Sequence, residues 1–443
     1  MVASKRPVTR LPHPPAARAR YLVVAVLHRV LSWCLSSVYR RSVKLEDLSA
    51  ARVLVLKPCC LGDVVFATPL LRELRRALPE AHLTFAVGTH SRPAVANNPT
   101  LDDLLDTGPV GSGRFTVRAY VALVRRLRAR RFDACLVLER SAVLALIPWL
   151  AGIPVRVGID SGGRGFSLSV AVPARPTRPE SELYLDLLRA MGGRPRSGEL
   201  EYVPSTPAIE RIERLMRERL PPSRPFVVLH GAGGINPGMA LPRKRWPAES
   251  FRSLADRIVQ AGATVVLVGS PEDRVDGRVG EWASGRRDAR LGHRADDGSA
   301  EARKGAKVPE PGPDPFRDLF ASFRDLRGPD ATPIVDLVGE LTLDELAALA
   351  RRAVAYVGND SGPSHLAEAA GANVVMLFGP SDPVTYGPRG RRAVALTAGL
   401  WCSPCFENGR VAPCANVLCM RSISVERVWN EVARCLAESD RLR

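Results

Sequence analysis

The patterns that most directly assign a chain of this length to a common enzyme class are missing from the sequence. It contains no G-x-x-x-x-G-K-[ST] phosphate loop, and no G-x-G-x-x-G follows its first strand-like run, which disfavours a nucleoside triphosphatase or a dinucleotide-binding enzyme. No Ser-His-Asp or His-Glu-x-x-His arrangement stands out either, so the usual signatures of hydrolases and zinc proteases are lacking. The polar residues that follow apolar runs are therefore the remaining indications of function.

The chain also lacks an uninterrupted apolar run of roughly 20 residues, the length that a membrane-spanning helix needs. The nearest stretch, Tyr21–Arg41, is interrupted by His28 and Arg29, which favours a helix that lies on a membrane surface or docks on the protein. No clear small-residue cleavage site follows it, so a secretory signal is disfavoured and a cytoplasmic protein is expected.

Acidic residues are missing from the first 44 residues, which contain nine basic ones. The whole chain has 63 Lys and Arg against 46 Asp and Glu, a net charge of +17, so about half of the excess lies in this leader. A basic leader without acids predicts an anionic surface such as phospholipid as a partner. Frequent arginine throughout the chain is the alternative explanation. No nucleic-acid partner is expected.

The rest of the chain shows the same pattern of strands and helices twice. At 443 residues it is too long for one ordinary core. Apolar runs at 52–57, 82–88 and 132–139 alternate with helical stretches, including one at 63–79, which predicts a parallel sheet covered by helices. The pattern restarts at Pro225. We therefore predict an α/β protein with two Rossmann-like domains that face a central cleft. The predicted segments are a basic leader (1–50), an N-terminal Rossmann-like domain (51–205), a C-terminal Rossmann-like domain (222–400) with a mobile insertion near 284–331, and a cysteine-rich tail with a closing helix (401–443).

Polar residues follow one strand of the second half especially densely. In open α/β sheets ligands bind beyond the carboxyl ends of the strands. Asn359 and Asp360 end a predicted strand, and Ser361 and Gly362 turn into a helix whose first amides can bind phosphate. Asp360 can hold sugar or ribose hydroxyls, and His365 lies in the first helical turn. An ordinary helix start, with Asp360 or Ser361 as its cap, is the alternative.

Two other loops of the second half carry charged residues. Lys244 stands just before a helix, where its ammonium group can meet a diphosphate. Trp246 is expected to pack and fix this loop rather than stack on a base. Glu272 follows a strand and can accept a hydrogen bond from a ribose or sugar hydroxyl. A basic surface loop and a solvated acid are the alternatives.

Asp63 follows the first strand of the chain, with Gly62 before it. A carboxylate there can accept the proton of a sugar hydroxyl as its oxygen attacks an anomeric carbon. Gly62 would let an acceptor approach the backbone closely. A helix cap explains Asp63 equally well.

Taken together, four segments in this order resemble glycosyltransferase family 9, the lipopolysaccharide heptosyltransferases. They are VLVLKPCCLGDVVFATPLLRELRRALPEA, KRWPAESFRSLADRI, GNDSGPSHLAEAAG and LFGPSDP, and the resemblance covers roughly residues 51–430. It implies a GT-B fold and inverting transfer of heptose from ADP-heptose to a lipid-linked lipopolysaccharide core, without a metal or other cofactor required for catalysis. It also implies a peripheral position on the inner face of the inner membrane, where the basic leader would hold the enzyme.

The resemblance implies that the N-terminal domain is the acceptor domain and the C-terminal domain the nucleotide-sugar domain, and it gives roles to individual residues. Asp63 matches the catalytic base beside the acceptor, and Lys244 matches the lysine on the donor phosphates. Cys59 and Cys60 depart from the family, which usually has small hydroxyl residues there. The donor-binding residues implied are Gly62, Glu272, Asn359, Asp360, Ser361, Gly362 and His365.

Four cysteines cluster near the C-terminus, at Cys402, Cys405, Cys414 and Cys419. One C-x-x-C with two further thiols nearby suits a structural tetrahedral zinc, although the spacing is not that of a standard ribbon. A disulfide or redox pair, and free thiols, are the other interpretations.

Two rival functions remain open from the sequence. One is a GT-B transferase that uses another nucleotide sugar in capsule or exopolysaccharide assembly. The other is a non-catalytic scaffold that binds nucleotide sugars.

Overall fold

The computed structural model describes residues 26, 28–30, 34, 42–175, 177–222, 224–236, 239–273, 334–406, 411, 414 and 416–441. The predicted insertion near 284–331 lies outside the described residues, and so does most of the leader. Among the described residues, no helix is both long enough and apolar enough to cross a bilayer.

The N-terminal half forms a six-stranded sheet in the order β3-β2-β1-β4-β5-β6, with every neighbouring pair parallel. Its central strands are buried on both faces, as expected for a parallel sheet covered by helices. The elements are η1 (Leu45–Leu48), β1 (Arg52–Leu56), α2 (Leu61–Phe66), α3 (Thr68–Ala77), β2 (His82–Val87), η2 (Arg92–Ala94), β3 (Asp103–Asp106), α4 (Val117–Ala129), β4 (Ala134–Val137), α5 (Ala142–Leu150), β5 (Val155–Asp160), β6 (Val170–Pro173) and α6 (Glu180–Arg189).

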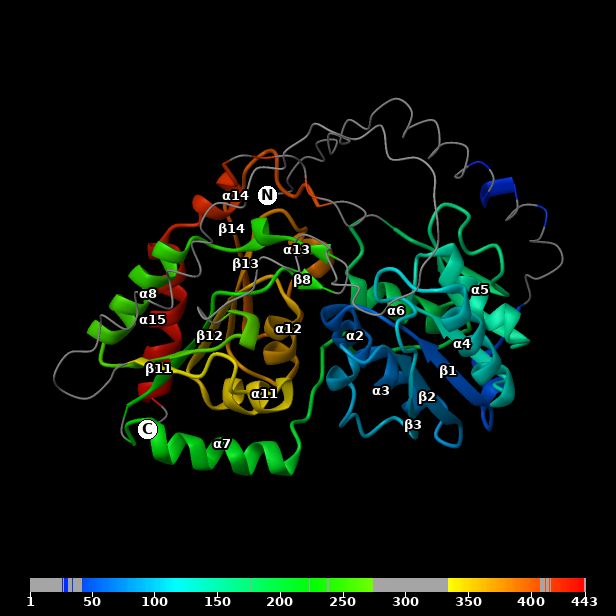
Figure 1. Ribbon diagram of the computed structural model, residues 1–443, viewed down its shortest axis with the longest axis horizontal. Helices are drawn as coiled ribbons and strands as arrows, with labels where there is room; N and C mark the ends of the chain where they lie inside the picture. Colours follow the sequence, from blue (N-terminus) through cyan, green and yellow to red (C-terminus); the bar gives the residue numbers. More distant parts are fainter. Residues whose placement is uncertain are drawn as a thin grey trace, which may run out of the picture.

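The C-terminal half repeats this topology in a second parallel sheet, in the order β11-β10-β7-β12-β13-β14. The connecting helix α7 (Thr206–Arg219) lies along α11 (Figure 1). The other elements are β7 (Phe226–His230), the β8–β9 ribbon (Ile235–Asn236 and Met239–Ala240), η3 (Pro242–Lys244), α8 (Ala248–Gln260), β10 (Thr264–Leu267), η4 (Pro271–Asp273), β11 (Ile334–Asp336), α11 (Leu343–Arg352), β12 (Ala355–Asn359), α12 (Gly362–Ala369), β13 (Val374–Phe378), α13 (Pro383–Tyr386), β14 (Ala393–Thr397), α14 (Leu418–Arg421) and α15 (Val425–Arg441).

The helix predicted at 63–79 is in fact two helices. α2 ends at Phe66 and α3 begins at Thr68. Pro69 has no backbone N–H to donate and is tolerated only in the first turn of a helix, so a new helix starts there. This break sets the direction of the short helix α2, which carries Asp63.

The two domains touch directly through α2 and α12 (Figure 1). Leu366 and Ala369 of α12 belong to the same buried cluster as the core of the N-terminal domain. The backbone N–H of Tyr202, in the linker before α7, donates to Ala369 O at 2.8 Å. The Asp344 carboxylate accepts from the Tyr202 hydroxyl and from the Asn97 amide, at 2.8 and 3.0 Å. α11 is thereby tied to both the linker and the first domain.

Candidate active site

The candidate site lies where each sheet reverses its strand order, between β1 and β4 in one domain and between β7 and β12 in the other. At such a switch point the connecting loops diverge and leave room for a ligand beyond the strand ends. The contact between α2 and α12, which follow β1 and β12, brings the two switch points together.

Lys57 organises the half of the site that the N-terminal domain contributes. Its ammonium nitrogen lies 3.0 Å from Asp63 Oδ2 and 3.1 Å from Glu139 Oε1. Burial by itself would lower the pKa of Lys57, but the charges of Asp63 and Glu139 raise it well above the usual value, so the amine stays protonated. Asp63 keeps 28% of its side chain exposed while Lys57 is almost fully buried. The aspartate is therefore held in place and still open to a substrate.

Gly62 faces the other domain rather than open space. A Cβ at Gly62 would lie 3.3 Å from His365 Cδ2, and a Cβ at Gly362 would lie 2.8 Å from Leu61 Cβ. The Phe66 ring packs against His365 with a centroid separation of 4.6 Å. In this structure the close approach predicted at Gly62 is thus made by α12, and the two glycines allow the domains to meet.

Asp360 organises the half contributed by the C-terminal domain. Its Oδ2 lies 2.6 Å from Lys244 Nζ and also accepts the Ser381 hydroxyl, and its Oδ1 lies 3.1 Å from His365 Nε2. Burial would raise the pKa of Asp360, but the charge of Lys244 and the hydrogen bond with His365 hold it well below the usual range. Asp360 is therefore a buried carboxylate that fixes a lysine, a histidine and a serine around it.

His365 is fully enclosed and sits between two acids. Burial tends to lower its pKa, but its hydrogen bond with Asp360 and the nearby charge of Glu368 raise it to about 9. The distance from His365 Nδ1 to Glu368 Oε2 is 3.8 Å, which is too long for a hydrogen bond. The imidazole therefore carries a positive charge at neutral pH, close to the start of α12.

Asn359 and Trp246 hold the loops rather than face a ligand. The Asn359 side chain donates to the carbonyl oxygens of Gly231 and Ala232 and accepts from the Trp246 backbone N–H, at 2.8 to 3.0 Å. Trp246 is fully buried, and its indole donates to Ile423 O at 2.9 Å. The prediction that Trp246 packs to fix this loop is confirmed.

The glycine-rich loop after β7 comes close to Ser361. Gly233 has a φ of 108°, and a Cβ there would lie 2.8 Å from Ser361 Cβ. Only glycine combines this backbone conformation with so close an approach. Arg245 Nε donates to Gly233 O at 2.9 Å, which fixes the loop beside the start of α12. Glu272 lies in η4, and its side chain is outside the described part of the chain.

The comparisons with known proteins agree with this arrangement. The model of glycosyltransferase family 9 (heptosyltransferase) matches residues 120–291 and 323–416, more than half of the chain. The chain belongs to glycosyltransferase family 9. Lipopolysaccharide heptosyltransferase 2 of Escherichia coli K12 is 26% identical over 350 residues, covering 77% of this chain and 86% of the relative. The chain is accordingly a glycosyltransferase.

Solved structures place the family-9 chain in the GT-B fold, as predicted. A family 9 glycosyl transferase from Veillonella parvula superposes with a TM-score of 0.65 at 20% identity, covering 88% of this chain and 98% of that one. The E. coli ADP-heptose lps heptosyltransferase II gives 0.61 at 21% identity, covering 88% and 99%.

The structure adds residues to the family-9 site that the sequence reading missed. Arg140, directly after Glu139, donates twice to the buried Glu180 carboxylate, at 2.9 and 2.6 Å. Tyr386 of α13 lies against Phe66 of α2, with ring centroids 6.5 Å apart, and its pKa is raised by burial and then by the charge of Asp63. The Lys244 ammonium nitrogen lies 5.0 Å from the centre of the Phe406 ring, which is a cation–π distance.

The four tail cysteines of the family-9 chain lie near one another. Burial raises the pKa of Cys419 to about 11, and Cys405, Cys402 and Cys414 act in the same direction. Cys414 Sγ accepts the Val417 N–H at 3.3 Å. Within the described ranges, however, no three Cys, His, Asp or Glu side chains converge closely enough to hold a metal ion.

The charge on His365 makes the stability of this family-9 enzyme depend on pH. Its folded pKa of about 9 is above the ordinary 6.5, so its stabilising contribution is complete below pH 6.5 and disappears as the pH rises through 9. We expect the stability difference between the native protein and His365→Gln, measured by urea unfolding, to shrink steadily between these two pH values. The exposed His90→Gln variant should show no such trend. A His365→Gln difference that stays constant would mean that His365 is neutral.

Proposed function

We propose that this enzyme transfers heptose from ADP-heptose to a lipid-linked lipopolysaccharide core, with inversion at the anomeric carbon. The contact between α2 and α12 carries the proposal, because it brings a carboxylate at the end of β1 to a cationic cluster at the end of β12. The names of similar proteins, such as the E. coli lipopolysaccharide heptosyltransferase 2 and the ADP-heptose lps heptosyltransferase II, support the choice of sugar, donor and acceptor.

The acceptor half of the proposed reaction belongs to Asp63. Its carboxylate takes the proton of the acceptor hydroxyl while that oxygen attacks the anomeric carbon. Lys57 holds the carboxylate in place by an ion pair of 3.0 Å, while 28% of the Asp63 side chain remains exposed. The attack and the departure of the diphosphate occur on opposite faces of the carbon, so a single displacement inverts its configuration.

The donor half belongs to Lys244 and the start of α12. The ammonium group of Lys244 has three N–H donors. One of them is directed to Asp360, and the other two remain for the diphosphate. The first amides of α12, at Ser361 and Gly362, and the positive end of the helix receive the same charge. We propose that these groups stabilise the departing ADP without a metal ion. Asp360 then acts by positioning Lys244 and His365, and Glu272 is proposed to bind the ribose.

Two further parts of the proposal concern the surroundings of the site. A lipid-linked acceptor would place the enzyme on the inner face of the inner membrane. We also propose that the cysteines of the tail, Cys402, Cys405, Cys414 and Cys419, close around a structural zinc ion. Thiolates are preferred zinc ligands, and the four cysteines stand within one short segment of the chain. Elemental analysis of the purified protein tests this, and less than about one zinc per chain would contradict it.

A thermal-shift panel with ADP-heptose, ADP, UDP, GDP and NAD tests the donor. A ligand present at 100 times its Kd adds about 2.7 kcal/mol to the free energy of unfolding. We expect the adenosine diphosphate ligands to stabilise the native protein and the Lys44→Ala control, and to lose most of this effect in Lys244→Ala. A response to UDP or GDP alone would keep a glycosyltransferase but discard ADP-heptose. Silence across the panel would contradict the proposed donor site. Product analysis by NMR, with the wrong anomer as the contrary result, tests inversion.

A further inference from the structure

Helix α5 presents an exposed face without polar side chains. Its sequence, AVLALIPWL, is entirely apolar, whereas a helix at a protein surface ordinarily directs polar residues outward. Val143 is 49% exposed and Trp149 is 40% exposed, and Leu146 between them is partly exposed. These three residues are spaced three apart, so they lie on one side of the helix. Exposed apolar surface of this kind usually marks an interaction site.

Helix α4 lies directly beside α5 and extends this surface. The Tyr120 hydroxyl donates to Val143 O at 2.7 Å, and the Arg128 guanidinium donates to Leu150 O at 2.6 Å. Two contacts in the same order along both helices mean that α4 and α5 run side by side in the same direction. Figure 1 shows them together on the outer side of the N-terminal domain.

The outer side of α4 alternates apolar and cationic residues. Val117 is 79% exposed and Val121 is 38% exposed, and Arg118 and Arg125 are exposed on the same side of the helix. Residues 107–132 contain seven arginines and no acid. The surface of α4 and α5 therefore combines exposed apolar side chains with exposed arginines.

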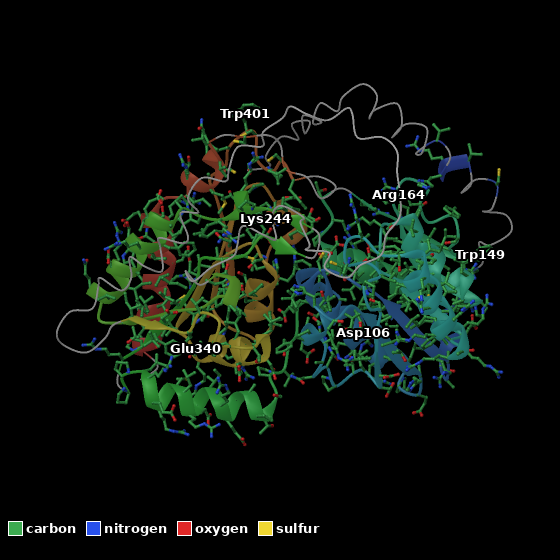
Figure 2. The ribbon with its side chains drawn as sticks, in the orientation of Figure 1. Asp106, Trp149, Arg164, Lys244, Glu340 and Trp401 are labelled. Carbon is green, nitrogen blue, oxygen red and sulfur yellow. The ribbon has the colours of Figure 1, made fainter. Side chains whose placement is uncertain are left out.

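His28, in the described part of the leader, lies at the same end of the domain. A Cβ at Gly163 would lie 2.8 Å from His28 O, so the backbone at His28 rests on the loop after β5. The rings of His28 and Phe166 are stacked with centroids 6.2 Å apart. The same loop reaches α5, because the Ser167 hydroxyl donates to Ala145 O at 2.9 Å. Figure 2 shows Arg164 of this loop and Trp149 at the same end of the molecule, near the described part of the leader.

We propose that this surface docks on a bilayer of anionic lipids. We call it the α4–α5 face. Trp149 would lie at the level of the headgroups, the valines would enter the boundary of the acyl chains, and the arginines would meet the lipid charges. The described part of the leader, in which His28 contacts the adjoining loop and Val26 and Val30 are exposed, would lie on the same bilayer. The proposal deepens the proposed transfer to a lipid-linked acceptor, but it does not depend on which sugar is transferred. The α4–α5 face comprises Val117, Arg118, Val121, Arg125, Val143, Leu146 and Trp149.

Flotation of the full-length protein with lipid vesicles tests the proposal. We expect binding to vesicles of phosphatidylcholine with phosphatidylglycerol, and much weaker binding to phosphatidylcholine alone. Removing one arginine near an anionic surface should weaken partitioning about fivefold, so Arg118→Gln with Arg125→Gln should weaken it about 25-fold. Val143→Gln with Trp149→Gln should weaken it at least tenfold, because the inserted apolar area is lost. Far-UV circular dichroism and the melting temperature establish that each variant is folded.

Matched controls are available outside the face. Val203 and Trp401 are 47% and 83% exposed, so Val203→Gln with Trp401→Gln removes the same residue types elsewhere. Arg351 and Arg352 are both exposed at the end of α11, so Arg351→Gln with Arg352→Gln is the control for the arginine pair. Both control pairs should bind vesicles like the native protein.

Several results would overturn the proposal. Equal binding to both kinds of vesicle would remove the role of anionic lipid. Native-like binding of the two face variants, with loss only on deletion of residues 1–41, would assign docking to the leader alone. Binding to duplex RNA without binding to vesicles would identify a nucleic-acid surface instead. None of these measurements uses a donor, so a wrong assignment of the sugar would leave them unaffected.

Discussion

Replacing Asp63 with asparagine is expected to lower kcat for heptosyl transfer by about 10²–10⁴-fold, the usual contribution of a general base. Asparagine has nearly the same shape and still hydrogen-bonds to Lys57, but it cannot accept the proton of the attacking hydroxyl. In the proposed arrangement the C-terminal domain binds the donor, so donor binding should be unchanged, as measured by thermal shift with ADP.

Glu139→Gln is the matched control for this variant. Glu139 touches the same lysine at 3.1 Å, but only 13% of its side chain is exposed, against 28% for Asp63. Burial raises the pKa of Glu139 while the charge of Lys57 opposes this, as expected for a carboxylate that serves to hold the lysine. We expect Glu139→Gln to lose far less activity than Asp63→Asn. Equal losses in the two variants would locate the effect in the Lys57 cluster as a whole and remove the case for Asp63 as the base.

The sequence predicts at which strand ends the candidate residues stand, but not which of those strand ends are neighbours. The rule that ligands bind beyond the carboxyl ends of strands points to residues that stand directly after or between apolar runs. These residues are Asp63, Lys244 and Asp360. Glu139 and Arg140 stand at such a place too, yet their importance depends on β4 pairing with β1, a tertiary contact that no local pattern contains. The same rule, applied to every predicted strand, would have named both as candidates.

Other residues of the site could not be recognised from the sequence, each for a different reason. Lys57 looks like the polar end of an apolar run, and only the buried ion pairs show what it does. Phe406 lies in a cysteine-rich tail, and it meets Lys244 because the backbone of Cys405 and Phe406 donates to Pro380 O at 2.8 Å. Asn359 was correctly placed at the strand end, but its polar atoms bond to the loops around it. A residue's position along a strand therefore predicts the neighbourhood of a ligand better than it predicts contact with one.

Replacing Lys244 with methionine is expected to lower kcat by about 10²–10³-fold, because preorganised charge at the leaving group acts mainly in the transition state. KM for the donor should rise less than kcat falls, since the diphosphate gains negative charge as its bond to the sugar breaks. Steady-state kinetics with a soluble acceptor measures both. A rise in KM with unchanged kcat would mean that Lys244 binds the donor equally well in the ground state and in the transition state.

The same variant also leaves a buried carboxylate without its strongest partner. Breaking a buried ion pair costs about 3–5 kcal/mol of stability when no other group compensates. Asp360 retains His365 and Ser381, so the loss should be smaller than this. Adding Asp360→Asn to Lys244→Met removes the uncompensated charge and should restore part of the stability measured by urea unfolding, but none of the activity. If activity returned with stability, Lys244 would act only through the fold, and the diphosphate would have to be stabilised by the amides of α12 alone.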